Sequence, residues 1–395
     1  MEETVHALYA FGSNTHCQLG LPHNNIDKVT TPTLAAYTID KEGIISIQGG
    51  AKHTLIHDKN GRTVFGAGDN ESAQLGTYFH VGLRSEIINY AMRSEQSTKT
   101  PLRYDTFEQL YKNIDFCAAG WKSTAYIVNR TASSPDGEDY AEVFTEGTCR
   151  WGELSRGQQV TPLSSTFETR LPGKVASFAA GTHHYVAVLE NGDVYGWGKT
   201  RLGQLGDSTD PIISPMKIPS ITPAYKVICG HDFTYIVGRR GSNGQRVMGR
   251  DKHGILNIPP DIRGWKDIQA TWHAIFVLFE NGKLIAWGKN DLWELVPPNL
   301  PPLDQIACGT EHILAVTKDG RLLAWGWGED GNCGDLSAIP TLRPNIVSGC
   351  WNEISIPGKI CKIGAGPNTS FVLTDVPRPT APVGKLPTMF GLPTK

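Results

Sequence analysis

The sequence predicts an all-β protein, a seven-bladed β-propeller, and three observations lead to this fold class. The first is a repeat: the segment 306–326 recurs nearly position for position at 178–198 and 47–68, and more loosely at 268–288. The second is a hairpin signal inside the copies. The third is that the two ends of the chain are complementary pieces of one copy. A repeat of this length is a supersecondary unit that cannot bury its own hydrophobic face, so the copies must stack.

Each copy is predicted to form three antiparallel strands. A short apolar run ends at a corner with a small residue or glycine, and a second run of alternating character follows. Next comes Asn-Gly or Asp-Gly, which supplies the positive φ angles of tight hairpins and so marks two paired strands. A third run ends in an aromatic residue and glycine. Strands joined by hairpins, without helical periodicity, are typical of a propeller blade. The turn signal stands at Asn60-Gly61, Asn191-Gly192, Asn281-Gly282 and Asp319-Gly320.

The corner positions give the number of blades. Thr271 occupies a corner where the other copies have glycine. The spacing between corners varies, and the extra length is expected in loops at 78–112, 129–141 and 335–359, the second of them mobile. The seven corners are Gly50, Gly120, Gly181, Gly230, Thr271, Gly309 and Gly366.

The two ends of the chain predict how the ring closes. Residues 5–12 match the third strand of a copy, and residues 360–374 match the first two strands. Together they make one blade, which pairs strand edges that would otherwise be exposed and closes the ring without a disulfide. We therefore expect a propeller at 1–375 and a disordered tail at 376–395, where five prolines prevent a blade strand.

The repeat motifs resemble those of the regulator-of-chromosome-condensation repeat family. The family's Gly-x-x-His corner is matched at 50–53 and 309–312. Its closure ending in Gly-Gln-Leu-Gly is matched at 197–206 and, with only Gln18-Leu19-Gly20 of that ending, at 12–20. The resemblance covers roughly residues 5–374 and implies a seven-bladed propeller, a fold that hosts unrelated binding tasks. Three segments are most similar to the fungal alpha-tubulin-suppressor branch, also described as killer-toxin-insensitivity factors: 9–14, 119–124 and 325–334.

That resemblance implies a function and a partner. The implied partner is a small zinc-binding, CSL-type protein that serves diphthamide synthesis on elongation factor two and Elongator-dependent modification of wobble uridine in tRNA. The propeller would be a non-catalytic scaffold that orients or protects the partner's metal site. The alternative is guanine-nucleotide exchange on a small GTPase, as for the founding member of the family, with the loop 335–359 long enough to act as a wedge. A microtubule-linked regulator is suggested only by the name of the branch.

Composition argues against several classes of function. Lys plus Arg number 37 and Asp plus Glu number 39, so the chain lacks the clustered positive charge that a nucleic-acid binder needs to displace counterions. The N-terminal residues do not resemble a signal peptide, and no apolar stretch approaches the length of a membrane span. We expect a cytoplasmic protein, with the nucleus left open as a second location, that is a monomer on its own and does not bind DNA, RNA or membranes directly.

The cysteines and histidines are interpreted as structural. The eight cysteines include no Cys-x-x-Cys pair, and we expect neither disulfides nor a metal site. Cys229 and Cys308 both precede a corner glycine, where a small buried residue fits, whereas Cys350 and Cys361 are expected in or near a loop. The corner histidines are expected to bond to the neighbouring blade's backbone rather than act as catalytic bases. No Ser-His-Asp grouping with a nucleophile elbow appears, so we expect neither an enzyme nor a cofactor.

Surface aromatic residues are the remaining candidates for function. Trp121 and Trp272 follow corner positions, and His273 follows Trp272. Because the corner loops converge on one rim, these side chains are candidate anchors for a partner, although they could instead plug the central channel. In a different set of loops, Trp327, Glu329 and Asp330 offer an aromatic and acidic group that also suits a partner.

Overall fold

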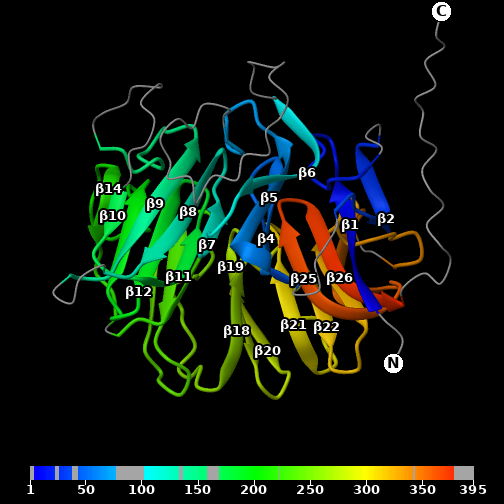
Figure 1. Cartoon of the computed structure of the whole chain (residues 1–395). Coiled ribbons are helices and arrows are strands. Elements are labelled where there is room, and N and C mark those ends of the chain that lie inside the picture. Colours follow the sequence, from blue (N-terminus) through cyan, green and yellow to red (C-terminus); the bar gives the residue numbers. More distant parts are fainter. Residues whose placement is uncertain are drawn as a thin grey trace, which may run out of the picture.

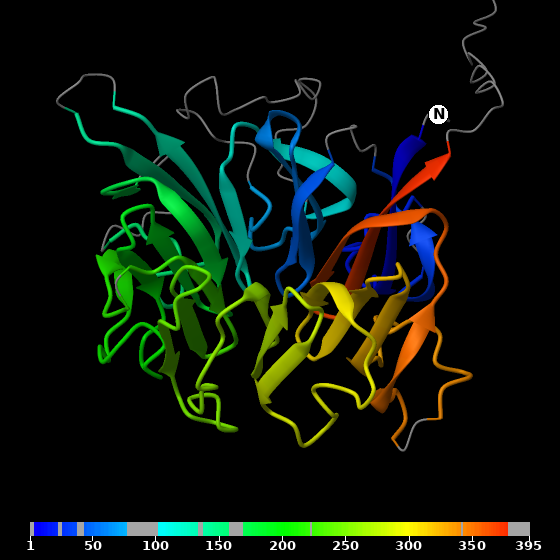
Figure 2. The same cartoon turned by 90° about the horizontal axis from the view of Figure 1, so that it is seen from below.

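Seven β-sheets stand around a central axis, which confirms the predicted propeller. The computed structural model describes residues 4–22, 26–37, 43–76, 102–132, 137–157, 169–221, 223–340 and 343–377. In Figure 2 the sequence colours run round the ring from green through yellow and orange to red, and return through blue and cyan. None of the helices within these ranges is long and apolar enough to cross a membrane.

Blades 1 to 6 are numbered in chain order by their corners. Blades 1 to 3 have four strands each: β3 (Ile44–Gly49), β4 (His53–Asp58), β5 (Thr63–Asp69) and β6 (Arg103–Tyr111), with the 3-10 turn η1 (Asn60–Arg62), in blade 1; β7 (Phe116–Ala119), β8 (Ser123–Arg130), β9 (Tyr140–Gly147) and β10 (Thr169–Leu171) in blade 2; and β11 (Val175–Ala180), β12 (His184–Leu189), β13 (Val194–Gly198) and β14 (Ile212–Lys217) in blade 3. Blades 4 and 5 have three strands each: β15 (Lys226–Cys229), β16 (Phe233–Val237) and β17 (Gln245–Gly249) in blade 4, and β18 (Trp265–Ala270), β19 (Ala274–Phe279) and β20 (Leu284–Gly288) in blade 5. Blade 6 has four strands: β21 (Leu303–Cys308), β22 (His312–Thr317), β23 (Leu322–Trp327) and β24 (Ile346–Ile354).

Blade 7 joins the two ends of the chain, as predicted. Its strands are β1 (Thr4–Ser13), β2 (Lys28–Leu34), β25 (Lys359–Gly366) and β26 (Thr369–Pro377), in the order β2-β1-β26-β25. Figure 1 shows the blue strand β1 beside the red strand β26. The register pairs Leu8 with Leu373, and both side chains are buried. Because β26 ends at Pro377, which pairs with Thr4, the predicted propeller boundary at 375 is two residues short. The rest of the predicted tail lies outside the described residues.

Outer strands are the main feature that the sequence analysis missed. The prediction gave each copy three strands, but five sheets have a fourth strand on their outer edge. Two of these outer strands, β6 and β24, fall within the segments predicted as the loops 78–112 and 335–359. Residues 78–101 of the predicted loop 78–112 lie outside the described ranges. So do residues 133–136 of the loop 129–141, which was predicted to be mobile. Cys350 lies in the middle of β24, so its expected position in or near a loop is wrong, whereas Cys361 lies at the start of β25, near the loop 355–358.

The hairpin turns form where predicted, but with a different geometry. In three of them only the glycine has positive φ: Gly192 at 87°, Gly282 at 90° and Gly320 at 90°. The amide of Gly192 donates to the Leu189 carbonyl, and the amide of Leu189 donates to the Asp193 carbonyl. This is a three-residue loop in which a turn is followed by a left-handed glycine. The Asn60-Gly61 turn is instead the 3-10 turn η1.

Buried histidines connect neighbouring blades. Nε2 of His184 in blade 3 lies 3.0 Å from the Thr234 hydroxyl in blade 4, and that hydroxyl donates to the Gln204 carbonyl in the closing loop of blade 3. The same chain of contacts runs from His53 through Thr124 to Gln74. A third runs from His312 through Ser370 to Asn332. The expected bond to the neighbouring blade therefore forms, and a hydroxyl of that blade is a partner in all three cases.

These contacts determine which histidine nitrogen carries the proton. The hydroxyl uses its own hydrogen on the carbonyl, so it must accept a hydrogen bond from Nε2–H, and Nδ1 is left unprotonated. A second proton would place a charge in a buried site. Burial accordingly lowers the pKa of His53 to about 4, and those of His184 and His312 to about 3.

The corner glycines leave room for these rings. A Cβ at Gly50 would lie 2.0 Å from Cε1 of His53 and 2.4 Å from the Gly120 carbonyl oxygen of the next blade. Blade 5 has the opposite combination of residue sizes. Thr271 stands at its corner instead of glycine, and the small Ala274 stands three residues later, where blades 1, 3 and 6 have histidine. The Thr271 hydroxyl accepts a hydrogen bond from the Ala274 amide at 3.0 Å. A larger corner residue is therefore tolerated where the inner side chain is small.

The buried histidines predict a pH-dependent stability. Unfolded histidines titrate near pH 6.5, well above the folded values, so the unfolded chain binds more protons as the pH falls and stability is lost between about pH 6.5 and 4. His184→Gln removes one titrating group. We expect the dependence of unfolding free energy on pH to flatten by up to about 1.4 kcal/mol per pH unit between about pH 5 and 6. Denaturant unfolding across this range measures it. The matched control is His253→Gln in a surface loop, and equal slopes for both variants would contradict the assignment.

The closing blade predicts a second stability effect. Leu8→Ala removes a fully buried side chain from β1 and should cost about 2–5 kcal/mol of unfolding free energy. Val5→Ala in the same strand removes an exposed side chain and should change it by less than about 0.5 kcal/mol. Denaturant midpoints compare the two. If both variants unfold like the wild type, the closing sheet does not stabilise the ring.

Candidate partner-binding face

The corners and the loops that follow the third strands lie on one face of the ring, which we call the corner face. Each corner joins the first strand to the second, and the third strand runs antiparallel to the second. The start of the second strand therefore pairs with the end of the third, as His312 does with Gly326. The Trp327 amide also donates to the Glu311 carbonyl at the corner of blade 6. Trp327, Glu329 and Asp330 thus share a face with Trp121, Trp272 and His273, although they belong to a different set of loops.

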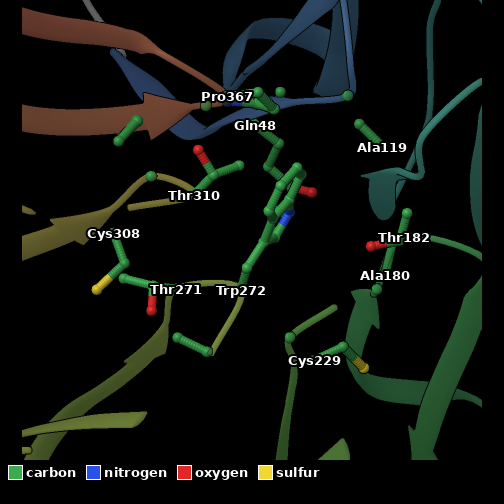
Figure 3. Close-up of a pocket in the computed structure, with 18 of the residues that line it drawn as sticks. Gln48, Ala119, Ala180, Thr182, Cys229, Thr271, Trp272, Cys308, Thr310 and Pro367 are labelled. Atoms are coloured by element: carbon green, nitrogen blue, oxygen red, sulfur yellow. The ribbon is translucent and has the colours of Figure 1, made fainter. Parts of the chain in front are cut away.

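A cavity of about 300 Å³ lies at the mouth of the central channel and is lined by corner residues of all seven blades. In Figure 3, Trp272 points from its corner across the channel towards Gln48, with Cys229 and Cys308 on the nearby wall. The rings of Trp272 and Trp121 have centroids 5.4 Å apart, although blades 3 and 4 separate their corners on the shorter side of the ring. The two indoles therefore meet across the channel.

Backbone hydrogen bonds between blades hold both tryptophans. The Trp121 amide donates to the Thr182 carbonyl, and the Trp121 carbonyl accepts from Ala51. Trp272 is held in the same way between Thr310 and His231. This arrangement agrees with the alternative left open in the sequence, in which the tryptophans plug the channel. Both remain half-buried, so their additional role as anchors for a partner stays a prediction.

A second cavity, which we call the basic pocket, lies between blades 4 and 5 beside Trp272. Its volume is about 280 Å³. Its one acidic residue, Asp232, is 2.6 Å from Nδ1 of His231 and 2.8 Å from Nζ of Lys199. Although burial alone would raise the pKa of Asp232, these two hydrogen bonds hold it well below its usual range. The residues that line the pocket are His231, Asp232, Phe233, Arg250, Lys252, Ile255, Trp272 and His273.

The charge of the basic pocket is therefore positive. Arg250 and Lys252 are both exposed, and neither side chain forms an ion pair with a described residue. His273 lies deeper, with its ring centroid 5.7 Å from that of His231. Burial and the neighbouring charge of His231 lower the pKa of His273 to about 4, so its ring is neutral at physiological pH. The pocket thus combines two exposed cations with the aromatic side chains of Phe233 and Trp272.

The loop after β23 carries a smaller acidic group. Glu329 is exposed and Asp330 is half-buried. Burial and the nearby Glu329 charge raise the pKa of Asp330, while Lys28 of blade 7 opposes this effect. Trp327 is fixed because its carbonyl accepts a hydrogen bond from the Asn332 side chain at 2.6 Å. The corner face therefore carries both signs of charge at separate positions.

Several residues on this face were not singled out in the sequence. The basic pocket uses Arg250 and Lys252 from a closing loop that has lost most of its motif. Asp251 preserves the geometry of that loop, because it accepts the Leu256 amide as Asn290 accepts Leu295 in blade 5. The guanidinium groups of Arg150 and Arg201 lie over the Trp151 ring, with their Cζ atoms 5.2 and 5.1 Å from its centroid. Aligning the closing loops of all copies would have placed these residues on one face.

The cysteines are all free thiols. Cys229 and Cys308 are half-buried and line the channel cavity, so the expectation that they are packed beneath the turn is only partly met. Burial raises the pKa of Cys229 to about 12, so this thiol is protonated at neutral pH.

Comparisons with known proteins agree with this architecture. A family model described as RCC1-like domain matches residues 7–372. The chain is 26% identical to an RCC1 repeat-containing protein of Schizosaccharomyces pombe, covering 93% of this chain and 99% of the relative. It is also 26% identical to the mouse secretion-regulating guanine nucleotide exchange factor, and this match covers 99% of this chain and 89% of the relative. The solved structure of yeast RCC1 bound to Kap60 aligns with a TM-score of 0.71 at 19% identity, over 96% of this chain and 90% of that one.

Proposed function

Because the chain belongs to the RCC1-like domain family, whose matched region spans all seven blades, we propose that it is a non-catalytic interaction scaffold. The proposed partner is a small CSL-type zinc protein, which the propeller orients or whose metal site it protects. In this role the chain supports diphthamide synthesis on elongation factor two and Elongator-dependent modification of wobble uridine in tRNA. The proposal places the protein in the cytoplasm, with the nucleus as a second location.

The basic pocket beside Trp272 is the main reason for proposing that the partner binds to the corner face. A zinc centre held by more than two thiolates has a net negative charge, because each thiolate contributes one negative charge against the two positive charges of the ion. Arg250 and Lys252 would attract such a centre, and Trp272 supplies apolar area next to them. Tryptophan and arginine are the residue types that most often dominate binding energy at interfaces.

Capture of the purified partner tests this surface. Trp272→Ala combined with Trp121→Ala should weaken binding about thirtyfold or more, as expected for the loss of a central aromatic anchor. Arg250→Glu with Lys252→Glu should weaken it about tenfold or more, and the loss should shrink as salt is raised. Isothermal titration calorimetry at two salt concentrations measures both effects.

The matched control lies on the opposite face. Lys283 is an exposed lysine next to the Asn281-Gly282 turn, and Lys283→Glu should leave the affinity unchanged. Equal losses in the control and the pocket variants would point to a general charge effect. Wild-type affinity in both sets of corner-face variants would exclude this surface, and no binding by the wild type would exclude the partner.

Nucleotide exchange on a small GTPase is the second candidate function. The mouse relative named as an exchange factor favours it, because the match covers nearly the whole of both chains. The segment 335–359, which would be long enough for a wedge if it were all loop, contains the outer strand β24 at 346–354, paired with β23. Among the described residues of that segment, only the shorter stretch 335–340 and 343–345 precedes β24 as a loop.

A kinetic assay separates the two functions. The scaffold role predicts that catalytic amounts of the protein leave the release of labelled GDP from Ran and from other small GTPases unchanged. A fluorescence assay, with an established exchange factor as positive control, measures the rate. Acceleration of release by the wild type would reverse the ranking.

A further inference from the structure

We propose that His6, Cys361 and Asp375 form a zinc-binding site in blade 7, where the two ends of the chain pair. One candidate ligand atom from each residue lies within 4.8 Å of the other two. The imidazole nitrogen, thiol sulfur and carboxylate oxygen of these side chains are all common zinc ligands. This site is separate from the corner-face surface proposed for a partner, and it would bind an ion rather than a protein.

The strand register brings the three residues together. His6 in β1 pairs directly with Asp375 in β26, and Nδ1 of His6 is 2.6 Å from Oδ1 of Asp375. Cys361 comes from β25 on the other side of β26. The three ligands therefore lie on three adjacent strands of one sheet, and the central strand supplies the carboxylate.

A β-bulge accounts for the position of the thiol. Ile360 pairs with Thr374 and Lys362 pairs with Leu373, so Cys361 is the extra residue in β25. A bulge re-aims a side chain relative to a regular strand. Here it coincides with the cysteine that lies near the His6 and Asp375 pair. An ion pair between histidine and aspartate needs no neighbouring thiol, whereas a metal ion uses all three groups.

The surroundings suit a shielded ion that can still exchange with solvent. The side chains of His6 and Asp375 are 17% and 33% exposed. Gly43 lies beside the ring, and a Cβ at that position would be 3.7 Å from Nε2 of His6. Tetrahedral zinc with bonds of about 2.0–2.3 Å would separate its ligand atoms by roughly 3.3–3.8 Å, so the cluster needs only side-chain adjustments. Water or an external group would complete the coordination.

Zinc binding would displace the thiol proton to solvent, because the thiolate is the ligand form. Burial and the hydrogen bond with Asp375 raise the pKa of Cys361 to about 11, so the metal-free side chain is a neutral thiol at pH 7. The thiolate and the carboxylate together balance the two charges of the ion. The bound ion would then connect β1 to both β25 and β26.

The test uses the purified full-length chain after treatment with a chelator. Zinc should bind with a stoichiometry near one and, at about a hundredfold excess over the dissociation constant, raise the melting temperature by a few degrees. Cobalt in place of zinc should give a near-ultraviolet absorption band from thiolate bonding. Cys361→Ser should remove that band and weaken zinc binding more than about tenfold. His6→Ala and Asp375→Asn should each weaken zinc binding as well.

Cys149→Ser is the matched control, because Cys149 is an exposed thiol outside this cluster. This variant should keep the cobalt band, the zinc affinity and the zinc-dependent melting shift of the wild type. Cys361→Ser is nearly isosteric, and its melting temperature without metal reports whether it folds. A cobalt band that persists in Cys361→Ser, or a wild-type melting temperature that zinc does not change, would overturn the proposal. Neither outcome bears on the partner proposed for the corner face.

Discussion

The contact between a buried imidazole and a hydroxyl of the next blade determines how neighbouring sheets fit together. The Nε2 atom of the imidazole and the hydroxyl are far from water, so each needs the other as a hydrogen-bond partner. Polar inner side chains accordingly face polar ones, as Ser123 faces the Tyr185 hydroxyl at 2.8 Å. Where the inner residue is apolar, its neighbour is apolar too: Phe233 shares a hydrophobic cluster with Ile275, and Ala274 shares one with Ile313. The same contact explains the glycine at the corner in blades 1, 3 and 6, because the imidazole ring occupies the space that a Cβ atom would need.

The sequence allowed the ring to be predicted because this contact leaves a repeated trace. Glycine, a polar residue three positions later and an aromatic-Gly pair recur at fixed offsets, and the split copy at the two ends required a closing blade. The outer strands leave no comparable trace. β2 and β14 are mostly exposed, so no regular apolar pattern marks them, and β6 begins far along the chain from β5. Such strands pair through backbone hydrogen bonds, which depend little on the identity of the side chains.

The candidate sites show the same limit. Trp121 and Trp272 could be assigned to the channel mouth because they occupy a repeated position. Their contact could not be predicted, since it joins blades 2 and 5 across the axis. The basic pocket depends on two closing-loop residues whose motif has degenerated. The cluster of His6, Cys361 and Asp375 is invisible to any rule based on ligand spacing, because ring closure joins residues from opposite ends of the chain.

The pair of indoles gives the corner face a floor where a ring would otherwise have an opening. A protein that lands on the axis meets a central apolar patch surrounded by polar loops, which is the layout of a dry interface core and a wet rim. Its contact surface can then be broad and shallow, with no need for a protruding tip to enter a hole. Orientation about the axis must come from the periphery, where cationic and anionic loops occupy different sectors.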